Sequence, residues 1–127
     1  MSEKARTMRI AVISDIHGNL EAFRAVLDTI EPLSIDTVVS LGDNIGYGPD
    51  SEAVVALIRD RKIASALGNH EMAVKNNQNL AWFNPVAKRA LVIARSQLSD
   101  ASLAWIKQLP RYIVIAGCRF VHGVPPD

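Results

Sequence analysis

The first half of the chain alternates short apolar runs with longer amphipathic stretches. Residues 8–14, 36–41 and 62–67 are short runs rich in Ile, Val, Leu and Ala, which predict buried strands. The stretch between the first two runs carries apolar side chains at helical spacing: Leu20, Phe23, Leu27 and Ile30. Residues 51–61 carry a second pattern of this kind. This β-α-β-α-β order predicts an α/β fold with a parallel sheet and right-handed crossovers.

Helix-capping residues support the predicted helices. Asn19 stands where the first helix should begin, and its side-chain oxygen can accept a bond from a backbone N–H. Asn84 followed by Pro85 predicts the start of a later helix, because proline suits the first helical position. That helix would turn one apolar face inward: Ala87, Leu91, Ala94 and Leu98. Ser99 predicts the cap of a further short helix.

The rest of the second half is less regular. Residues 111–116 and 119–122 have strand patterns and predict a hairpin around a turn at Gly117 and Cys118. Because aromatic side chains are usually buried, we expect three of them to be packing residues rather than a ligand cage: Trp82, Phe83 and Trp105.

Composition limits the classes of partner and the location. The net charge is +1, so the chain has neither the basic field expected for nucleic-acid binding nor an acidic tail. The apolar run after the polar residues 1–7 is too short for a signal peptide, and no run approaches the roughly 18 apolar residues of a membrane span. One cysteine, Cys118, excludes an internal disulfide. We therefore expect a cytoplasmic protein that binds neither membranes nor specific nucleic acids, with a disordered tail over residues 1–7.

Four polar motifs follow predicted strands at the points where those strands end. Residues 15–19 (Asp-Ile-His-Gly-Asn), 42–44 (Gly-Asp-Asn) and 68–71 (Gly-Asn-His-Glu) follow the three parallel strands, and 122–123 (His-Gly) follow the last strand of the hairpin. In open α/β sheets, ligands bind outside the carboxyl ends of the strands. The motifs, although far apart in sequence, are therefore predicted to converge on one cleft.

The residues in these motifs are suited to binding metal ions. Asp15 and His17 lie two positions apart, where a turn can direct both at one ion, and the two oxygens of Asp43 can bridge two cations. Asn69 offers a neutral amide oxygen. Mixed imidazole and oxygen ligands suit Mn, Fe, Zn, Co or Ni better than Ca or Mg. All three histidines of the chain lie in these motifs, which strengthens the prediction of a metal site.

Each motif alone also has an ordinary structural explanation. Asp15 and Asn19 could be caps of the first helix, and Asp43 could be a turn residue. A lone His122 at a strand end is more often a structural histidine with satisfied hydrogen bonds. The four motifs together, each after a predicted strand, favour a metal site over these separate explanations.

Other chemistries have less support. Residues 46–48 (Gly-Tyr-Gly) are only a fragment of a dinucleotide-binding fingerprint, and the phosphate-binding P-loop sequence does not occur. Ser14 and Cys118 lack an evident histidine and acid that would make either of them a nucleophile.

Three segments carry a family resemblance: Asp15-Ile-His-Gly-Asn-Leu-Glu-Ala, Leu-Gly-Asp43-Asn-Ile-Gly-Tyr-Gly-Pro and Leu-Gly-Asn69-His-Glu. They resemble the motifs of the calcineurin-like metallophosphoesterase superfamily, in a version similar to its small bacterial and archaeal phosphodiesterase branch. The resemblance runs from Met8 to Pro125. It implies an α/β sandwich, of which this chain would be the N-terminal part, and metal-dependent hydrolysis of a phosphodiester or nucleotide-like phosphoester.

The resemblance also implies a role for each site residue. Five residues would bind two divalent ions, with manganese favoured: Asp15, His17, Asp43, Asn69 and His122. Within this set, Asp43 would bridge the two ions and the others would divide between them, the first two on one ion and the last two on the other. His70 would bind no metal; it would face the substrate, stabilise the phosphoryl oxygens and protonate the leaving group. A water activated by the two metals would be the nucleophile.

The chain departs from the family at its carboxyl end. Members carry a later Gly-His-x-His motif that adds one histidine to each metal, and no such motif follows His122. We therefore expect residues 8–127 to form one metallophosphoesterase domain that is incomplete at its carboxyl end, and the chain alone to be a poor catalyst. The alternative is a truncated, non-catalytic module that binds metal or a partner. A second copy of the chain is one candidate partner, because it could complete the site.

Overall fold

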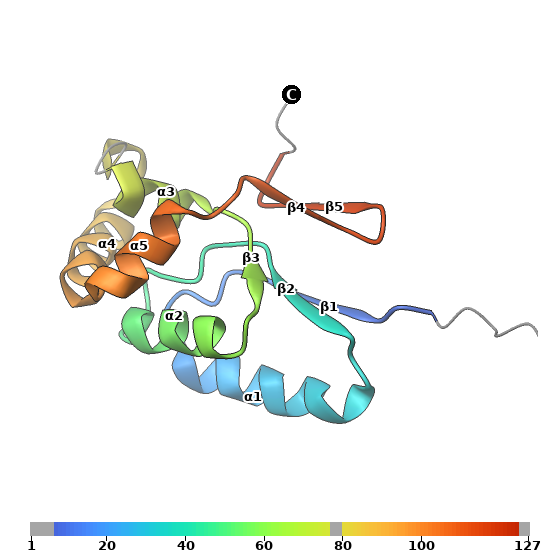
Figure 1. The fold of residues 1–127 in the computed structure, drawn as a ribbon. Helices are drawn as coiled ribbons and strands as arrows, with labels where there is room; N and C mark the ends of the chain where they lie inside the picture. The colour runs from blue at the N-terminus through green and yellow to red at the C-terminus, as the bar shows by residue number, and fades with distance from the viewer. Residues whose placement is uncertain (1–6, 77–79, 125–127) are drawn as a thin grey trace, which may run out of the picture.

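The structure, a computed structural model, describes residues 7–76 and 80–124. Its centre is a parallel sheet in the order β1-β2-β3, formed by Ile10–Ile13, Thr37–Ser40 and Ala64–Ser65 (Figure 1). Because each strand is joined to the next through a helix, the carboxyl ends of all three meet at one edge of the sheet. The parallel sheet and its helices confirm the predicted α/β architecture.

The third strand is shorter than the run 62–67 that predicts it. The backbone N–H of Lys62 bonds to Arg59 and that of Ile63 to Ile58, so both residues belong to the end of the preceding helix. The N–H of Leu67 donates to Pro110, outside the sheet, at 2.8 Å. Only two residues of the run remain to pair with β2.

Helices α1 (Leu20–Ile30) and α2 (Ser51–Asp60) lie on one side of the sheet (Figure 1), and a 3-10 turn over Glu31–Leu33 follows α1. The Asn19 side chain accepts the N–H of Ala22 at 3.1 Å, which confirms the predicted cap. Apolar residues of this layer form a buried cluster: Phe23, Leu27, Val54, Ile58 and Ile63. Burial of such side chains contributes about 1.5–3 kcal/mol each. It holds both helices against the strands whose ends carry the polar motifs.

A second helical group comprises α3 (Asn69–Asn76), α4 (Pro85–Gln97) and α5 (Asp100–Lys107), with a 3-10 turn over Leu80–Trp82. Asn84 accepts the N–H of Ala87 at 2.9 Å and Ser99 accepts the N–H of Ser102 at 3.1 Å, so both predicted caps are confirmed. These helices and α2 enclose a second apolar cluster: Ile45, Val55, Ala73, Val74, Leu91, Leu98 and Ile106. Because Ile45 belongs to the loop after β2, this cluster also anchors that loop.

The sequence pattern does not predict α3. Its buried residues include His70 and Glu71 beside Ala73 and Val74, so the face it turns inward is half polar. An apolar periodicity cannot reveal such a helix. The polar pair instead packs against the loop after β2, where both residues are hydrogen-bonded to Asp43.

The hairpin consists of β4 (Tyr112–Ile115) and β5 (Cys118–Val121), paired antiparallel. The predicted turn at Gly117 and Cys118 is wrong by one position. The two central residues are Ala116 and Gly117, with φ of 52° and 77°, and Cys118 pairs with Ile115. A two-residue hairpin turn of this kind needs positive φ at both central positions.

The aromatic residues divide differently from the prediction. Phe83 and Trp105 are partly buried against the apolar clusters, as expected of packing residues. Trp82, in contrast, is 87% exposed, so the prediction that it packs inside is wrong.

In the described part of the chain, no helix is long and apolar enough to cross a membrane. The predicted disordered tail falls mainly on residues 1–6, which lie outside the described residues.

Candidate metal centre

The loops after β1 and β2 run side by side beyond the sheet. The N–H of Asp15 donates to the Gly42 carbonyl at 3.0 Å, and the N–H of His17 donates to the Asp43 carbonyl at 3.0 Å. Asp15, His17 and Asp43 all have positive φ, of 57°, 50° and 56°. Residues other than glycine seldom adopt this conformation, and it is found preferentially at functional sites.

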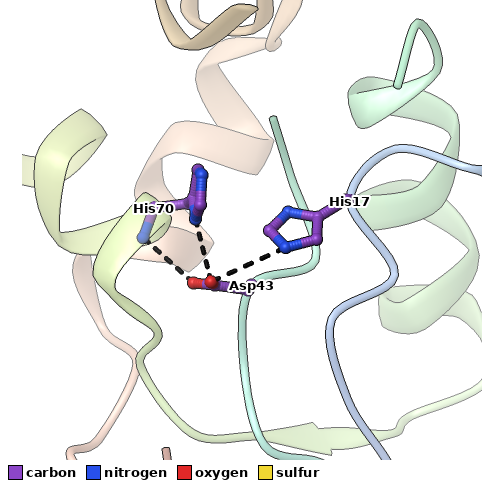
Figure 2. Close-up of side chains that lie close together, drawn as sticks. All are labelled: His17, Asp43 and His70. Atoms are coloured by element: carbon purple, nitrogen blue, oxygen red, sulfur yellow. Dashed lines mark hydrogen bonds and ion pairs between the residues drawn. The ribbon is translucent and has the colours of Figure 1, made fainter. Parts of the chain in front are cut away.

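Asp43 lies at the centre of the site (Figure 2) and is 3% exposed. The backbone N–H of His70 donates to Asp43 Oδ1 at 3.0 Å, and His70 Nδ1 lies 2.8 Å from Asp43 Oδ2. Burial alone would raise the pKa of the Asp43 carboxyl, but the side-chain and backbone hydrogen bonds from His70 bring it below its ordinary value. Asp43 is therefore an anion at neutral pH, as a bridging ligand must be.

Asp15, Asp43 and His122 form one group in which each offers a ligand atom within 4.8 Å of the others. His122 Nε2 lies 3.5 Å from Asp43 Oδ2, while His122 Nδ1 lies 3.1 Å from the Leu41 carbonyl. A carbonyl accepts a bond from a ring N–H, so the tautomer with its proton on Nδ1 would offer the lone pair of Nε2 toward Asp43. This is the usual arrangement of a histidine that binds metal.

His17 has the same arrangement from the opposite side. Its Nδ1 lies 3.0 Å from the Ile45 carbonyl, and its Nε2 points toward two carboxylates, 3.4 Å from Asp15 Oδ1 and 3.8 Å from Asp43 Oδ2. The hydroxyl of Ser14 donates to Asp15 Oδ2 and helps to orient that carboxylate.

The side-chain amide of Asn69 tests whether the site fits a cation. One end of the amide faces His122 Nε2 and Asp43 Oδ2, each at 2.9 Å. With the nitrogen at that end, the amide donates hydrogen bonds to both groups. With the oxygen there, three lone-pair donors from three segments face one another, and a cation is the species that they would share. The donor set therefore fits a divalent metal ion.

His70 is 5% exposed, and its ring is enclosed by other aromatic side chains. The ring centroid lies 4.6 Å from that of His17, 5.3 Å from that of Tyr47 and 5.0 Å from that of Phe83. Its Nε2 is buried without a hydrogen-bond partner among the described residues. His17, Asp43 and His70 also form a second group whose ligand atoms lie within 4.8 Å of one another. Two roles thus fit this position, proton donor and metal ligand. His70→Ala would keep bound metal if His70 is a proton donor and would lose it if His70 is a ligand.

Glu71 is a site residue that the sequence reasoning does not single out. It is fully buried, and its Oε2 accepts the N–H of Asp43 at 2.9 Å. Its Oε1 accepts the backbone N–H of Asn44 at 2.7 Å and the side-chain amide of Asn44 at 2.9 Å. Burial raises the pKa of the Glu71 carboxyl, with a contribution from the charge of Asp43, although the bonds from Asn44 and Asp43 oppose the shift. The one sequence signal for Glu71 is its place in the Gly-Asn-His-Glu motif.

Gly68 allows α3 to approach the loop after β2. A Cβ at this position would lie 2.2 Å from Asp43 Oδ1, 2.3 Å from Asp43 N and 2.7 Å from Glu71 Oε2. Distances this short cannot be relieved by rotating a side chain, since one of the atoms is backbone. The glycine is thus required by the close contact between the two motifs.

Gly68→Ala is expected to separate Asp43 from α3. Overpacking of this kind costs about 1–3 kcal/mol of stability, and we expect metal affinity to fall at least about tenfold because the ligands move apart. Thermal unfolding and calorimetric titration with Mn²⁺ measure the two effects. Ala104→Gly at an exposed position of α5 is the control, because it should cost a comparable amount of stability, about 1 kcal/mol, and should leave metal affinity unchanged. Wild-type metal affinity in Gly68→Ala would show that the close contact is not required.

Comparison with known proteins gives the family. The model of the calcineurin-like phosphoesterases matches residues 8–123, a range that includes all six predicted site residues. The chain belongs to the calcineurin-like phosphoesterase family. Members of this family use divalent metals, and the convergent donor set around Asp43 agrees with that chemistry.

Individual relatives match this chain over less than half of their own length. The uncharacterized protein MJ0912 of Methanocaldococcus jannaschii is 39% identical over 104 residues, which are 82% of this chain and 43% of the relative. The symmetrical bis(5'-nucleosyl)-tetraphosphatase of Wigglesworthia glossinidia brevipalpis is 45% identical over 64 residues, 48% of this chain and 24% of that enzyme. A crystal structure of a metallophosphoesterase from Sphaerobacter thermophilus superimposes with a TM-score of 0.71 at 38% identity, over 87% of this chain and 44% of that one. The chain thus spans less than half the length of these relatives, and its fold is confirmed as that of the family.

Proposed function

We propose that this chain supplies the central part of a two-metal centre that hydrolyses a phosphodiester or nucleotide-like phosphoester. The observation that supports this proposal is the convergence on Asp43 of ligand-type side chains from four separate segments, after β1, β2, β3 and β5. Such a cluster of carboxylate, imidazole and amide groups is typical of transition-metal sites.

The proposed ligands divide around the Asp43 carboxylate. Asp15 and His17 would hold one ion, Asn69 and His122 would hold the other, and Asp43 would contribute to both. Two divalent cations held there, for which we favour manganese, would supply Lewis-acid chemistry: they would polarise phosphoryl oxygens and lower the pKa of a water nucleophile. The carbonyls of Ile45 and Leu41 lie against Nδ1 of His17 and of His122 and orient the two rings, so that Nε2 of each faces the centre.

His70 is proposed as the proton donor to the leaving group. With Nδ1 donating to Asp43, the ring has Nε2 as its remaining position for a mobile proton. The ring is held by contacts with Tyr47 and Phe83, and its Nε2 has no hydrogen-bond partner among the described residues, so this atom is not already engaged by the protein. An alkoxide leaving group needs that proton, whereas an acidic leaving group does not.

Two cavities beside the centre are proposed to hold the rest of the substrate. One, of about 370 Å³, is lined by Asn69, Met72, Ala73, Trp82 and Phe83. The other, of about 380 Å³, extends from Tyr47 to Arg89 on α4. An exposed indole beside a proposed metal ligand offers a stacking surface for a planar group, and Arg89 offers positive charge to an anionic one. The nucleotide substrate named for the Wigglesworthia relative has both features.

The test of the proposed function is hydrolysis of bis(p-nitrophenyl) phosphate by the purified chain with Mn²⁺, compared with Asp43→Asn prepared identically. Turnover that requires Mn²⁺ and is lost in the variant supports the proposal. Equal turnover in both proteins would place the activity elsewhere. Tight metal binding without turnover, in this chain and in a version extended by a relative's carboxyl-terminal half, would contradict the catalytic function.

A non-catalytic module that binds metal or a partner is the second candidate function. One observation favours it: Val12 on β1 and Tyr112 and Val114 on β4 are 48%, 42% and 58% exposed. Exposed apolar side chains on strands suit pairing with another chain, including a second copy. Light scattering at several concentrations measures such association directly.

Trp82→Ala is expected to weaken substrate binding selectively. We expect KM for a nucleoside p-nitrophenyl phosphodiester to rise about 5–100-fold, the range implied by stacking on one aromatic side chain. The KM for methyl p-nitrophenyl phosphate should change little, and Trp82→Phe should keep most of the affinity for the nucleoside ester. An equal loss for both substrates in Trp82→Ala would show that the indole does not stack on the nucleoside.

A further inference from the structure

Glu71 connects helix α3 to the loop after β2 through hydrogen bonds. It lies in the first turn of α3, two residues after Asn69, and reaches the loop that carries Asp43. Both oxygens of its carboxylate are used, one by the backbone N–H of Asp43 and the other by the backbone and side-chain N–H groups of Asn44. Among the described residues, the Glu71 carboxylate is the hydrogen-bond acceptor of the Asp43 N–H.

The position is costly for a carboxylate, which indicates a specific requirement. Glu71 is fully buried, and its charge lies close to the charge of Asp43. A buried anion is disfavoured unless hydrogen bonds compensate it, and an apolar side chain of similar size would avoid that penalty. Only a group with two acceptor oxygens can satisfy the N–H groups of two consecutive residues and the amide of Asn44 at once.

We propose that Glu71 is a positioning residue that sets the distance between the ligands on the β2 loop and those on α3. This inference rests on the proposed metal centre. Asp43 has positive φ, a conformation that a residue other than glycine keeps only when its surroundings hold it, and its backbone N–H is bonded to Glu71. Because Glu71 shares a helical turn with Asn69 and His70, its bonds fix Asp43 relative to both of them.

Hydrogen bonds of Asn44 connect Glu71 to the sheet. The Asn44 amide donates to Ser65 on β3 at 2.9 Å, and its oxygen accepts from Ser40 on β2 at 2.6 Å. The carboxylate of Glu71 thus completes a buried network that joins β2, β3 and α3. Networks of this kind lose their rigidity when one member can no longer accept its bonds.

The test compares Glu71→Gln with Val74→Ala. Glutamine keeps the size of the side chain but presents an NH₂ group to one of the N–H donors. Val74 is on the same helix and 4% exposed, but it faces the apolar cluster and so controls for a general loss of stability. We expect Glu71→Gln to weaken Mn²⁺ binding about 10–100-fold, as for other groups that orient metal ligands. Val74→Ala should change affinity less than about threefold, at a matched decrease in Tm, since it leaves the ligands in place.

Amide hydrogen exchange gives a readout that does not need metal. Relative to the Val39 amide on β2, the amides of Asp43 and Asn44 should exchange at least about tenfold faster in Glu71→Gln and remain unchanged in Val74→Ala. Equal Mn²⁺ affinity in Glu71→Gln and wild type, or an equal loss in both variants, would overturn the proposal. If the wild type binds no Mn²⁺, the proposed metal centre fails, and unchanged relative exchange in Glu71→Gln would separately overturn the role of Glu71.

Discussion

Asp43→Ala is expected to lower Mn²⁺ affinity more than any other single substitution, by at least about 100-fold, which exceeds the 10–100-fold loss typical of groups that only orient a ligand. The carboxylate belongs to both groups of candidate ligands, and its Oδ2 is within hydrogen-bond or ion-pair distance of the rings of His17, His70 and His122. Removing it takes the shared anion from both proposed ions. Isothermal titration with Mn²⁺ measures the loss.

Two controls distinguish the loss of a ligand from a general effect of the substitution. Asp28→Ala removes one carboxylate from the exposed side of α1 and should leave Mn²⁺ affinity unchanged. Far-ultraviolet circular dichroism should show that Asp43→Ala keeps its helices, because the apolar clusters on both sides do not include Asp43. Equal metal content in Asp43→Ala and wild type would rule out the assignment of Asp43 as the bridging ligand.

The second large effect is expected for His70→Ala. We expect kcat for an alkyl phosphoester to fall about 10²–10⁴-fold, the usual contribution of a general acid. Mn²⁺ affinity should fall no more than about tenfold, because the substitution removes a hydrogen bond to Asp43 but no proposed ligand. The measurement is the ratio of kcat between wild type and variant, made in whichever form of the protein turns over substrate.

The leaving group and the metal content separate the two roles of His70. A p-nitrophenolate leaving group needs little protonation, so His70→Ala should slow its release much less than that of an alkoxide. If His70 is instead a metal ligand, the variant will lose bound metal and will slow both substrates alike. That outcome would assign His70 to the second cluster, with His17 and Asp43.

Much of the fold can be predicted from the sequence, because apolar spacing marks elements that bury one face. The strands β1 and β2, the helices α1 and α2 and the caps at Asn84 and Ser99 all carry such local signals. The helix α3 carries none, since it buries His70 and Glu71 beside two small apolar residues. The length of β3 depends on a bond from Leu67 to Pro110, a contact between distant residues that local pattern does not contain.

The candidate site, like the fold, can be predicted only in part from the sequence. Its six predicted residues converge because the strands that precede them are parallel neighbours or, for His122, because the hairpin brings its end to Leu41. The sequence does not show that Glu71 accepts the N–H groups of the β2 loop, because that depends on how closely α3 approaches. Gly68 permits this close approach, because a Cβ at its position would collide with Asp43. The sequence alone does not show that contact. The extent of the domain over residues 8–127 and the cytoplasmic location remain predictions.

We expect two metal ions to bind on either side of the Asp43 carboxylate. Anomalous diffraction from crystals of the protein soaked in Mn²⁺ locates such ions directly. The structure leads us to expect two peaks about 3.5–4 Å apart, one near Asp15 and His17 and one near Asn69 and His122, with Asp43 between them. Saturating Mn²⁺ that gives no peak at Asp43, or peaks only elsewhere on the molecule, would contradict the claim.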